Sequence, residues 1–256
     1  MKNLIKITLL SFTLSLLTTP SFAHYFAIKP FQFSVDSFEK IAFVVISSET
    51  LLVPEELESL ENTNLQLIQG SNTEKLQLKS NDVLQTLDGV AKVDKNSSAI
   101  IAGHRKGMIW TNTKDGWKQA GKKGLTGVIK SSKYEKFCKV LVNSKENDSN
   151  YKKVVGHRFE IVPMTNPALL DVGDYMEIKI SLDGKPVSTG IKATYECFSE
   201  ISGAYAYYVT SSDKGIAKIK ITSPGTWIID TKNEIKKGTE DYDTHVLKTM
   251  LIFEVK

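Results

Sequence analysis

Short stretches of alternating apolar and polar residues, separated by Gly, Asn, Asp and Ser, run through most of this 256-residue chain. Residues 40–48 (KIAFVVISS) and 175–182 (YMEIKISL) are examples. Alternation with a period of two indicates half-buried β-strands. Asp-Gly pairs at 88–89 and 183–184 favour hairpin turns, because glycine tolerates a positive φ. The pattern predicts a mainly β protein with two β-sandwich-like domains of the Ig-like or jelly-roll-like kind.

The predicted domains meet in a polar, turn-rich segment, NSKENDSNYKK, at residues 143–153. Residues 24–150 are predicted to form the N-terminal β domain, and residues 151–256 the C-terminal β-sandwich domain. Apolar residues between 126 and 144 recur partly at a spacing of three to four. That spacing predicts a short helix or extended crossing segment near the end of the N-terminal domain.

The first 23 residues have the composition of a cleaved signal peptide. Lys2 and Lys6 precede an apolar run, and Ser21 and Ala23 are the small residues that signal peptidase prefers. The apolar run is short for a bilayer span, so an uncleaved anchor is the weaker interpretation. We therefore expect an exported, periplasmic protein that starts at His24 and does not span a membrane once mature.

The charge of the chain does not indicate a nucleic-acid partner. Lys and Arg exceed Asp and Glu by 33 to 29, a formal charge of +4, and removal of Lys2 and Lys6 leaves +2. No basic stripe with interleaved aromatic residues is present. Cys138 and Cys197 are the two cysteines, and neither belongs to a CxxC pair. Export permits a disulfide between them, but the sequence leaves that pairing open.

The common signatures of catalytic sites are missing from the chain. It contains no GxSxG, HExxH, Walker loop or GxGxxG. Scattered Ser, Asp, Glu and His residues do not form a distinguishing pattern. We therefore predict a protein that is not an enzyme, without catalytic residues.

Histidine is scarce, and the placement of the four histidines carries the functional prediction. Cleavage after Ala23 would give His24 a free α-amine beside its imidazole, two nitrogens that can chelate one metal. A further imidazole would complete a nitrogen-rich set, which favours Cu(II) or Ni(II). His104 (AGHRKG) and His157 (VVGHRF) are the candidates for it. An accidental N-terminal histidine is the alternative, and His245, which follows an acidic run, is left undecided.

The segment GHRFEIVPMTNPALLDVGDYMEIKISLDGKPVSTGIKATYE resembles an exported bacterial family of domains of unknown function, related to NikM-like or NikK-like periplasmic components of nickel and cobalt uptake. The matching residues are Gly156, His157, Glu160, Ile161, Val162, Pro163, Asn166, Pro167, Gly173, Asp174, Asp183, Gly184, Lys185 and Pro186. AHYFAIKP is similar to the family's Ala-His start, and AGHRKGMIW to its Gly-x-His strand. The resemblance implies that His24 and His104 are ligands, whereas His157 falls at a family position of variable type.

The resemblance implies a metal-binding protein that captures Ni(II) or Co(II) and passes the ion to a separate inner-membrane uptake transporter. The predicted metal ligands are His24, His104 and His157. Two copper alternatives stay open, a Cu(II) chaperone and a copper-dependent oxidative enzyme with an N-terminal histidine. A structural or carbohydrate-binding sandwich without metal is a further alternative.

Overall fold

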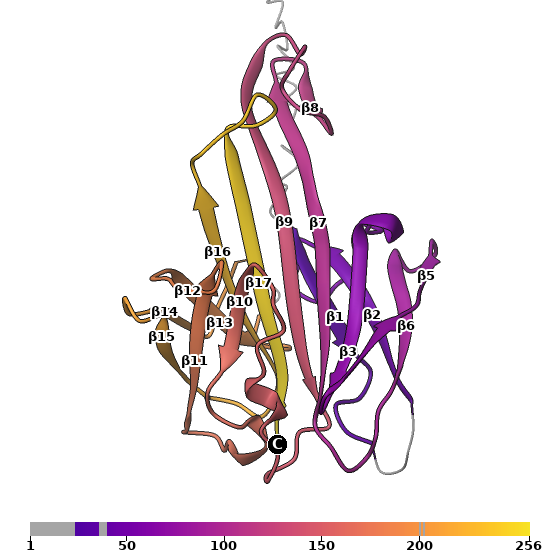
Figure 1. Ribbon diagram of the computed structural model, residues 1–256, viewed down its shortest axis with the longest axis vertical. Coiled ribbons are helices and arrows are strands. Elements are labelled where there is room, and N and C mark those ends of the chain that lie inside the picture. The colour runs from indigo at the N-terminus through magenta and orange to yellow at the C-terminus, as the bar shows by residue number, and fades with distance from the viewer. Residues whose placement is uncertain (1–23, 36–39, 200, 202) are drawn as a thin grey trace, which may run out of the picture.

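A computed structural model describes residues 24–35, 40–199, 201 and 203–256, and these residues form three β-sheets (Figure 1). The central sheet has nine strands: β14 (Tyr207–Thr210), β13 (Gly190–Tyr195), β16 (Gly225–Ile235), β17 (Thr244–Val255), β9 (Val128–Val142), β7 (Ala99–Thr113), β3 (Thr63–Gln69) and β4 (Asn72–Leu76) in that order, with β8 (Gly116–Lys118) on β7. The predicted signal peptide lies outside the described residues. The prediction of a mainly β protein is confirmed.

Two four-stranded sheets flank the central one. The N-terminal sheet contains β1 (Tyr25–Pro30), β2 (Lys40–Ser48), β6 (Thr86–Lys92) and β5 (Leu78–Asn81). The C-terminal sheet contains β10 (Phe159–Pro163), β11 (Tyr175–Leu182), β12 (Lys185–Pro186) and β15 (Ile216–Lys220). In the described residues the only helical segments are the 3-10 turns η1 (Leu60–Asn62), η2 (Asn150–Lys152) and η3 (Pro167–Leu169).

The middle of the central sheet is covered on both faces and separates two hydrophobic cores. On β9, Cys138 and Val140 belong to the core shared with the N-terminal sheet. Phe137 and Leu141 belong to the core shared with the C-terminal sheet. Since successive side chains of a strand point to opposite faces, one strand supplies both cores. The molecule is therefore two β-sandwiches that share their middle layer, with the N-terminal and C-terminal sheets on opposite sides in Figure 1.

The segment near residue 130, predicted as a short helix or an extended crossing segment, is the 15-residue strand β9, so the helical alternative is wrong. β9 pairs with β7 in antiparallel orientation and with β17 in parallel orientation. A strand covered on both faces needs no strict alternation, and its apolar residues can therefore fall at helix-like spacings. The unbroken burial from Phe137 to Val142 is the feature that produced the misleading spacing.

The division predicted at residue 150 does not separate two independent sheets. β9 precedes that point and β17 follows it, yet they are neighbours over nine residue pairs. Ile228 and Ile252, from the second half of the chain, lie in the core beneath the N-terminal sheet. Residue 150 instead lies in η2, in the connection between the central and C-terminal sheets.

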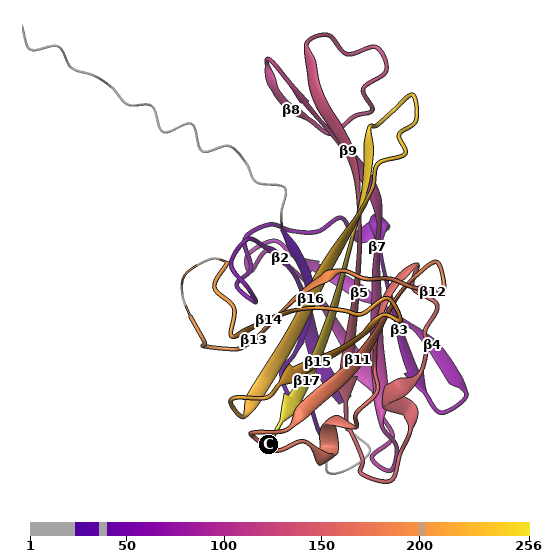
Figure 2. The ribbon, with the colours of Figure 1, turned by 90° about the vertical axis from the view of Figure 1, so that its left-hand side faces the viewer.

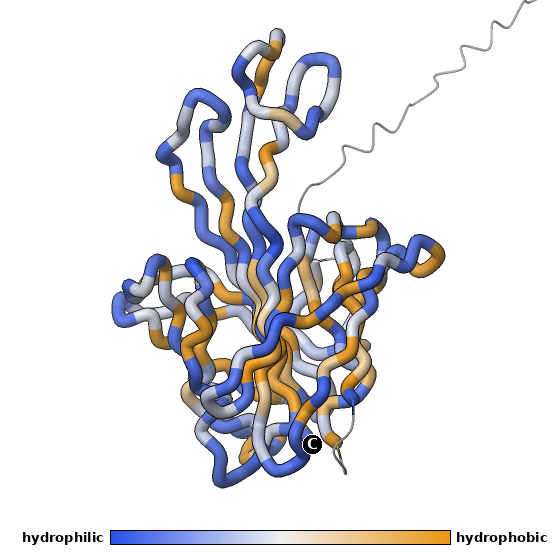
Figure 3. The backbone as a smooth tube through the Cα atoms, turned by 45° about the vertical axis from the view of Figure 1, so that its right-hand side comes forward, coloured by the Kyte–Doolittle hydropathy of each residue, from blue (hydrophilic) through white to orange (hydrophobic). Residues whose placement is uncertain are grey.

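The ends of β7, β9, β16 and β17 extend together beyond the flanking sheets, as Figures 1 and 2 show. Figure 3 shows hydrophobic segments gathered in the body of the molecule, whereas the extension is mainly hydrophilic or neutral. A β-bulge interrupts the pairing of β7 with β9 between Arg105 and Met108. The extra residue reverses which face of the sheet the following residues of β7 occupy. Arg105 and Met108, three residues apart, therefore point to the same face and border the same small cavity.

The two cysteines are free, Cys138 buried and Cys197 exposed, so the disulfide that the sequence left open is not formed. Among the described residues, no helix has the length and apolar character needed to cross a membrane.

Candidate functional site

The pairing of β1 with β2 fixes the position of His24. Tyr25 pairs with Ser48 in the antiparallel register, which places the preceding His24 beside Glu49. The chain after β2 then folds back, and Glu56 forms an isolated bridge with Ser47. Two carboxylates seven residues apart in sequence are thereby brought to one imidazole.

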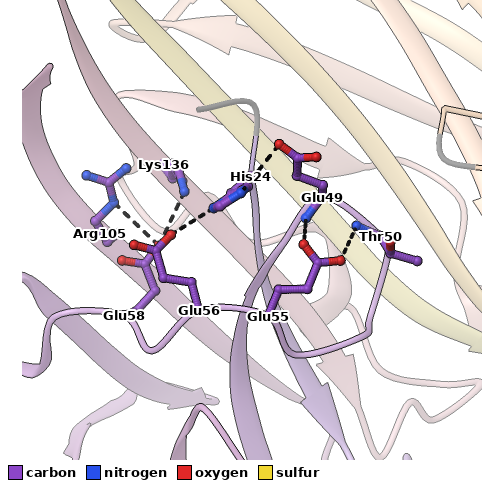
Figure 4. Close-up of polar contacts among 8 residues, drawn as sticks. All are labelled: His24, Glu49, Thr50, Glu55, Glu56, Glu58, Arg105 and Lys136. Carbon is purple, nitrogen blue, oxygen red and sulfur yellow. Dashed lines mark hydrogen bonds and ion pairs between the residues drawn. The ribbon is translucent and has the colours of Figure 1, made fainter. Parts of the chain in front are cut away.

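His24 contacts both carboxylates directly (Figure 4). Its Nδ1 lies 2.8 Å from Glu56 Oε2, and its Nε2 lies 3.6 Å from Glu49 Oε1. The imidazole is mostly covered, with 22% of its side-chain surface exposed, whereas Glu56 is 57% exposed. The hydrogen bond from His24 lowers the pKa of Glu56, against an opposing effect of partial burial. Glu56 therefore offers an ionised oxygen to a cation from solution.

Glu55 holds the loop that carries Glu49 and Glu56. Its carboxylate accepts backbone hydrogen bonds from Glu49 at 2.8 Å and Thr50 at 3.0 Å (Figure 4). Desolvation acts to raise the pKa of Glu55, but these backbone donors outweigh it and the pKa is lowered. The loop is thus fixed by main-chain contacts, which leaves the other two carboxylates facing His24.

Two buried cations lie beneath the site and share a third carboxylate. Glu58 Oε1 is 3.3 Å from Lys136 Nζ and 3.8 Å from Arg105 Nε. Burial lowers the pKa of Lys136 to about 8, although Glu58 opposes this effect. His24, Glu56, Glu58, Arg105 and Lys136 all border a cavity of about 40 Å³. Because Glu58 lies between the two cations, Glu56 is not their principal partner.

His104 and His157 lie on the other face of the central sheet, so the predicted set of three histidines is not brought together. A side chain built at Gly103 would meet Phe26 and Ile28 of β1, and its neighbour His104 points the opposite way. His104 stacks on Phe137 with ring centroids 4.8 Å apart, and His157 packs 5.1 Å from the same ring. His24 therefore cannot bind one metal ion together with His104 and His157, because the central sheet lies between His24 and the other two.

His104 and His245 instead share Glu135. His104 Nε2 is 2.7 Å from one carboxylate oxygen and His245 Nε2 is 3.0 Å from the other. Burial opposes ionisation of Glu135, but its contacts with the two histidines lower its pKa. His245 Nδ1 lies 3.1 Å from Arg158 Nη1, and arginine can only donate. Nδ1 is thus the acceptor and Nε2 carries the proton, which disfavours a metal at Nε2 of His245.

The burial of His157 predicts that the protein loses stability in acid. Burial, with smaller contributions from Lys139 and His104, lowers the pKa of His157 to about 3, from its usual 6.5. As the pH falls from 6.5 towards 3, the unfolded chain takes up a proton that the folded chain refuses, so stability is lost in this window. We expect His157→Phe to remove a pH-dependent loss of roughly 3 kcal/mol between pH 7 and pH 4.

Urea unfolding of the wild type and His157→Phe at pH 7 and pH 4 measures this difference, and the acid effects of carboxylates cancel in the comparison. An equal loss of stability in the two proteins would contradict the buried, neutral histidine. Phenylalanine suits the test because it preserves the ring contact with Phe137.

No three His, Cys, Asp or Glu side chains of the described residues are arranged to hold a metal ion by themselves. At His24 the side-chain donors become sufficient only with the α-amine that cleavage after Ala23 would create. The sequence interpretation missed Glu49 and Glu56. The signal available was the acidic segment ETLLVPEELE, which follows a strand able to pair with the segment after His24.

Comparisons with known proteins identify a family. No curated protein matches the chain. Among solved structures, the mouse nectin-like molecule 4 ectodomain (Ig1–Ig3) has 11% identity and a TM-score of 0.19, with 90% of this chain and 64% of that chain covered. The D0-D1 domain of intimin has 13% identity and a TM-score of 0.22, with 90% and 98% covered. The model of DUF4198, a domain of unknown function, matches residues 21–235, so the chain belongs to that family.

Proposed function

We propose that this protein is an exported, non-catalytic carrier that binds one divalent transition-metal ion at an N-terminal His24. The observation that carries the proposal is the convergence of Glu49 and Glu56 on that imidazole. Cleavage after Ala23 would add the α-amine to the same place. The donors would then be the α-amine and Nδ1 of His24 with an oxygen of Glu56, which faces Nδ1, whereas Glu49 faces Nε2 and would orient the ring.

The electrostatic surroundings support this arrangement. Glu56 and Glu49 are the carboxylates that contact His24 and would balance a bound dication, while Glu58 offsets one of the two positive charges of Arg105 and Lys136. The lowered pKa of Glu56 keeps it ionised, and it is accessible to solvent. An ordinary α-amine has a pKa near 8 and must lose its proton to bind a metal. We therefore expect affinity to increase between pH 6 and pH 8.

We propose Ni(II) or Co(II) as the cargo and an inner-membrane uptake transporter as the recipient, with capture and release in the periplasm. This choice of cargo rests on the sequence resemblance. Nitrogen and carboxylate ligands also suit Cu(II), and the general order of affinities favours copper. A copper carrier is therefore the second candidate, and metal preference in a competition between Ni(II), Co(II) and Cu(II) distinguishes the two.

Neutralising Glu56 tests the site. Glu56→Gln keeps an oxygen near His24 but removes the charge, and we expect Ni(II) affinity to fall about tenfold, or about 1.4 kcal/mol. Isothermal titration of the mature chain measures this. Glu240→Gln is the matched control, because Glu240 is an exposed carboxylate paired with Lys123 on the extension.

Unchanged affinity in Glu56→Gln, with the control also unchanged, would exclude Glu56 as a ligand. Absence of Ni(II), Co(II) and Cu(II) binding by the mature wild-type chain would overturn the carrier. The structural or carbohydrate-binding sandwich would then replace it.

A further inference from the structure

The small cavity beneath His24 lies on the Glu56 side of the imidazole, where the α-amine and Nδ1 would hold a metal ion. His24 and Glu56 border this cavity of about 40 Å³, and Arg105 of β7 and Lys136 of β9 border it from the central sheet. Figure 4 shows both cations on the same side of His24 as Glu56. One water molecule needs roughly 10–15 Å³ of such a cavity, so there is room for about three non-hydrogen atoms.

The guanidinium of Arg105 has a buried donor without an acceptor. Its Nε has no hydrogen-bond partner among the described residues, although the side chain is only 4% exposed. The Glu58 carboxylate lies 3.8 Å from Nε, too far for a hydrogen bond, and Nη1 donates to the carbonyl of Lys106. A buried donor that lacks an acceptor lowers stability. A small ligand with an acceptor oxygen would offset that loss.

The charges around the cavity change sign when a dication binds. Glu49 and Glu56 would balance the dication, and Glu58 offsets one of the two buried cations, so one positive charge is left in excess. Without the dication, the same side chains carry one negative charge in excess. A small anion would therefore be attracted to this cavity only after the metal ion has bound.

Metal binding at His24 would also leave a coordination position for such an anion. The α-amine, Nδ1 and an oxygen of Glu56 supply three donors, and a tetragonal Ni(II) or Cu(II) ion takes at least four. Since His24 and Glu56 both border the cavity, a ligand inside it can reach the ion that they hold.

We propose that a small planar monoanion of the carboxylate type occupies this cavity and binds together with the metal ion. The inference rests on the proposed function. One oxygen of the anion would coordinate the ion, and the other would accept hydrogen bonds from Arg105 and Lys136. The planar fork of arginine suits a carboxylate-type anion better than a spherical halide. Only coordination and hydrogen bonds form, and no covalent bond breaks.

Equilibrium dialysis of the mature chain against Ni(II) and radiolabelled formate, with perchlorate as the other anion, tests the proposal. Formate is the smallest carboxylate, and the protein-free compartment reports any formate held by free nickel. We expect about one nickel and one formate per chain, and no retention of formate when nickel is omitted. Retention of nickel without formate would overturn this inference and leave the proposed function standing. Retention of neither would overturn both, and equal retention of formate with and without nickel would overturn the coupling.

Two variants assign the anion to the cavity. In the wild type, saturating formate is expected to raise Ni(II) affinity about tenfold, and chloride much less. Arg105→Lys keeps the charge but loses the planar fork, whereas Lys136→Met removes one positive charge. In each variant, the ratio of Ni(II) affinities with and without formate should fall to about one.

Arg158→Lys is the matched control, because Arg158 pairs with Asp183 and does not border the cavity. Thermal unfolding checks that each variant is folded, and the dialysis of the wild type decides the matter if neither is. A full formate effect in both folded variants, or an equal effect of chloride on the wild type, would overturn the proposed anion site.

Discussion

A single methionine left before His24 is expected to weaken Ni(II) binding about 100-fold, equivalent to about 2.7 kcal/mol. The extension converts the α-amine into an amide, which is a poor metal ligand at neutral pH, and it separates the charged terminus from the imidazole. Glu49 and Glu56 remain in place, so the change isolates the contribution of the amine. Isothermal titration of the extended and the mature chains under identical conditions gives the ratio.

The control for this comparison is Met-extended His24→Ala, which lacks both nitrogens. If the amine matters, the extended wild type and this variant differ little, because each has lost the chelate ring. Equal Ni(II) affinity of the mature and extended chains would exclude chelation by the N-terminus, whatever the side chains contribute.

The largest effect on stability is expected at the buried ion pair between Lys139 and Glu160. The exposed fractions of the two side chains are 2% and 1%. Glu160 also accepts hydrogen bonds from the backbone of Val155 and Gly156, and Lys139 donates to the carbonyl of Lys153. We expect Glu160→Gln to cost about 3–5 kcal/mol, because it leaves a buried ammonium without its counter-charge.

A double-mutant cycle with Lys139→Met separates the pair from its surroundings. The double variant is expected to be more stable than Glu160→Gln alone, since it removes the uncompensated charge. Burial lowers the pKa of Lys139, against the opposing charge of Glu160, so the cost of Glu160→Gln should also shrink at high pH. Urea unfolding gives the four free energies, and additive effects would contradict an energetically coupled pair.

Local sequence patterns predicted the strands of this fold better than their pairing. The alternation at residues 40–48 and 175–182 corresponds to β2 and β11. For β9 a helix and an extended segment both stayed open, because burial on both faces removes the period of two. The sharing of the central sheet by both halves depends on the parallel pairing of β9 with β17, and no local pattern encodes that contact.

The candidate site was predictable only at His24. His104 was chosen for its type and its neighbouring glycine, but which face of β7 it occupies depends on long-range pairing. Glu49 and Glu56 reach His24 through the β1–β2 register and a loop that folds back onto Ser47. These are tertiary relations, so the acidic segment could be seen in the sequence but not its partner.

Native mass spectrometry of the exported chain, purified without a tag and supplied with Ni(II), tests the central claim most directly. One spectrum reports both the N-terminal residue and the number of bound ions. We predict a mass that begins at His24 and carries one nickel. A chain that begins at another residue, or one that begins at His24 and carries no metal, would contradict the N-terminal metal site.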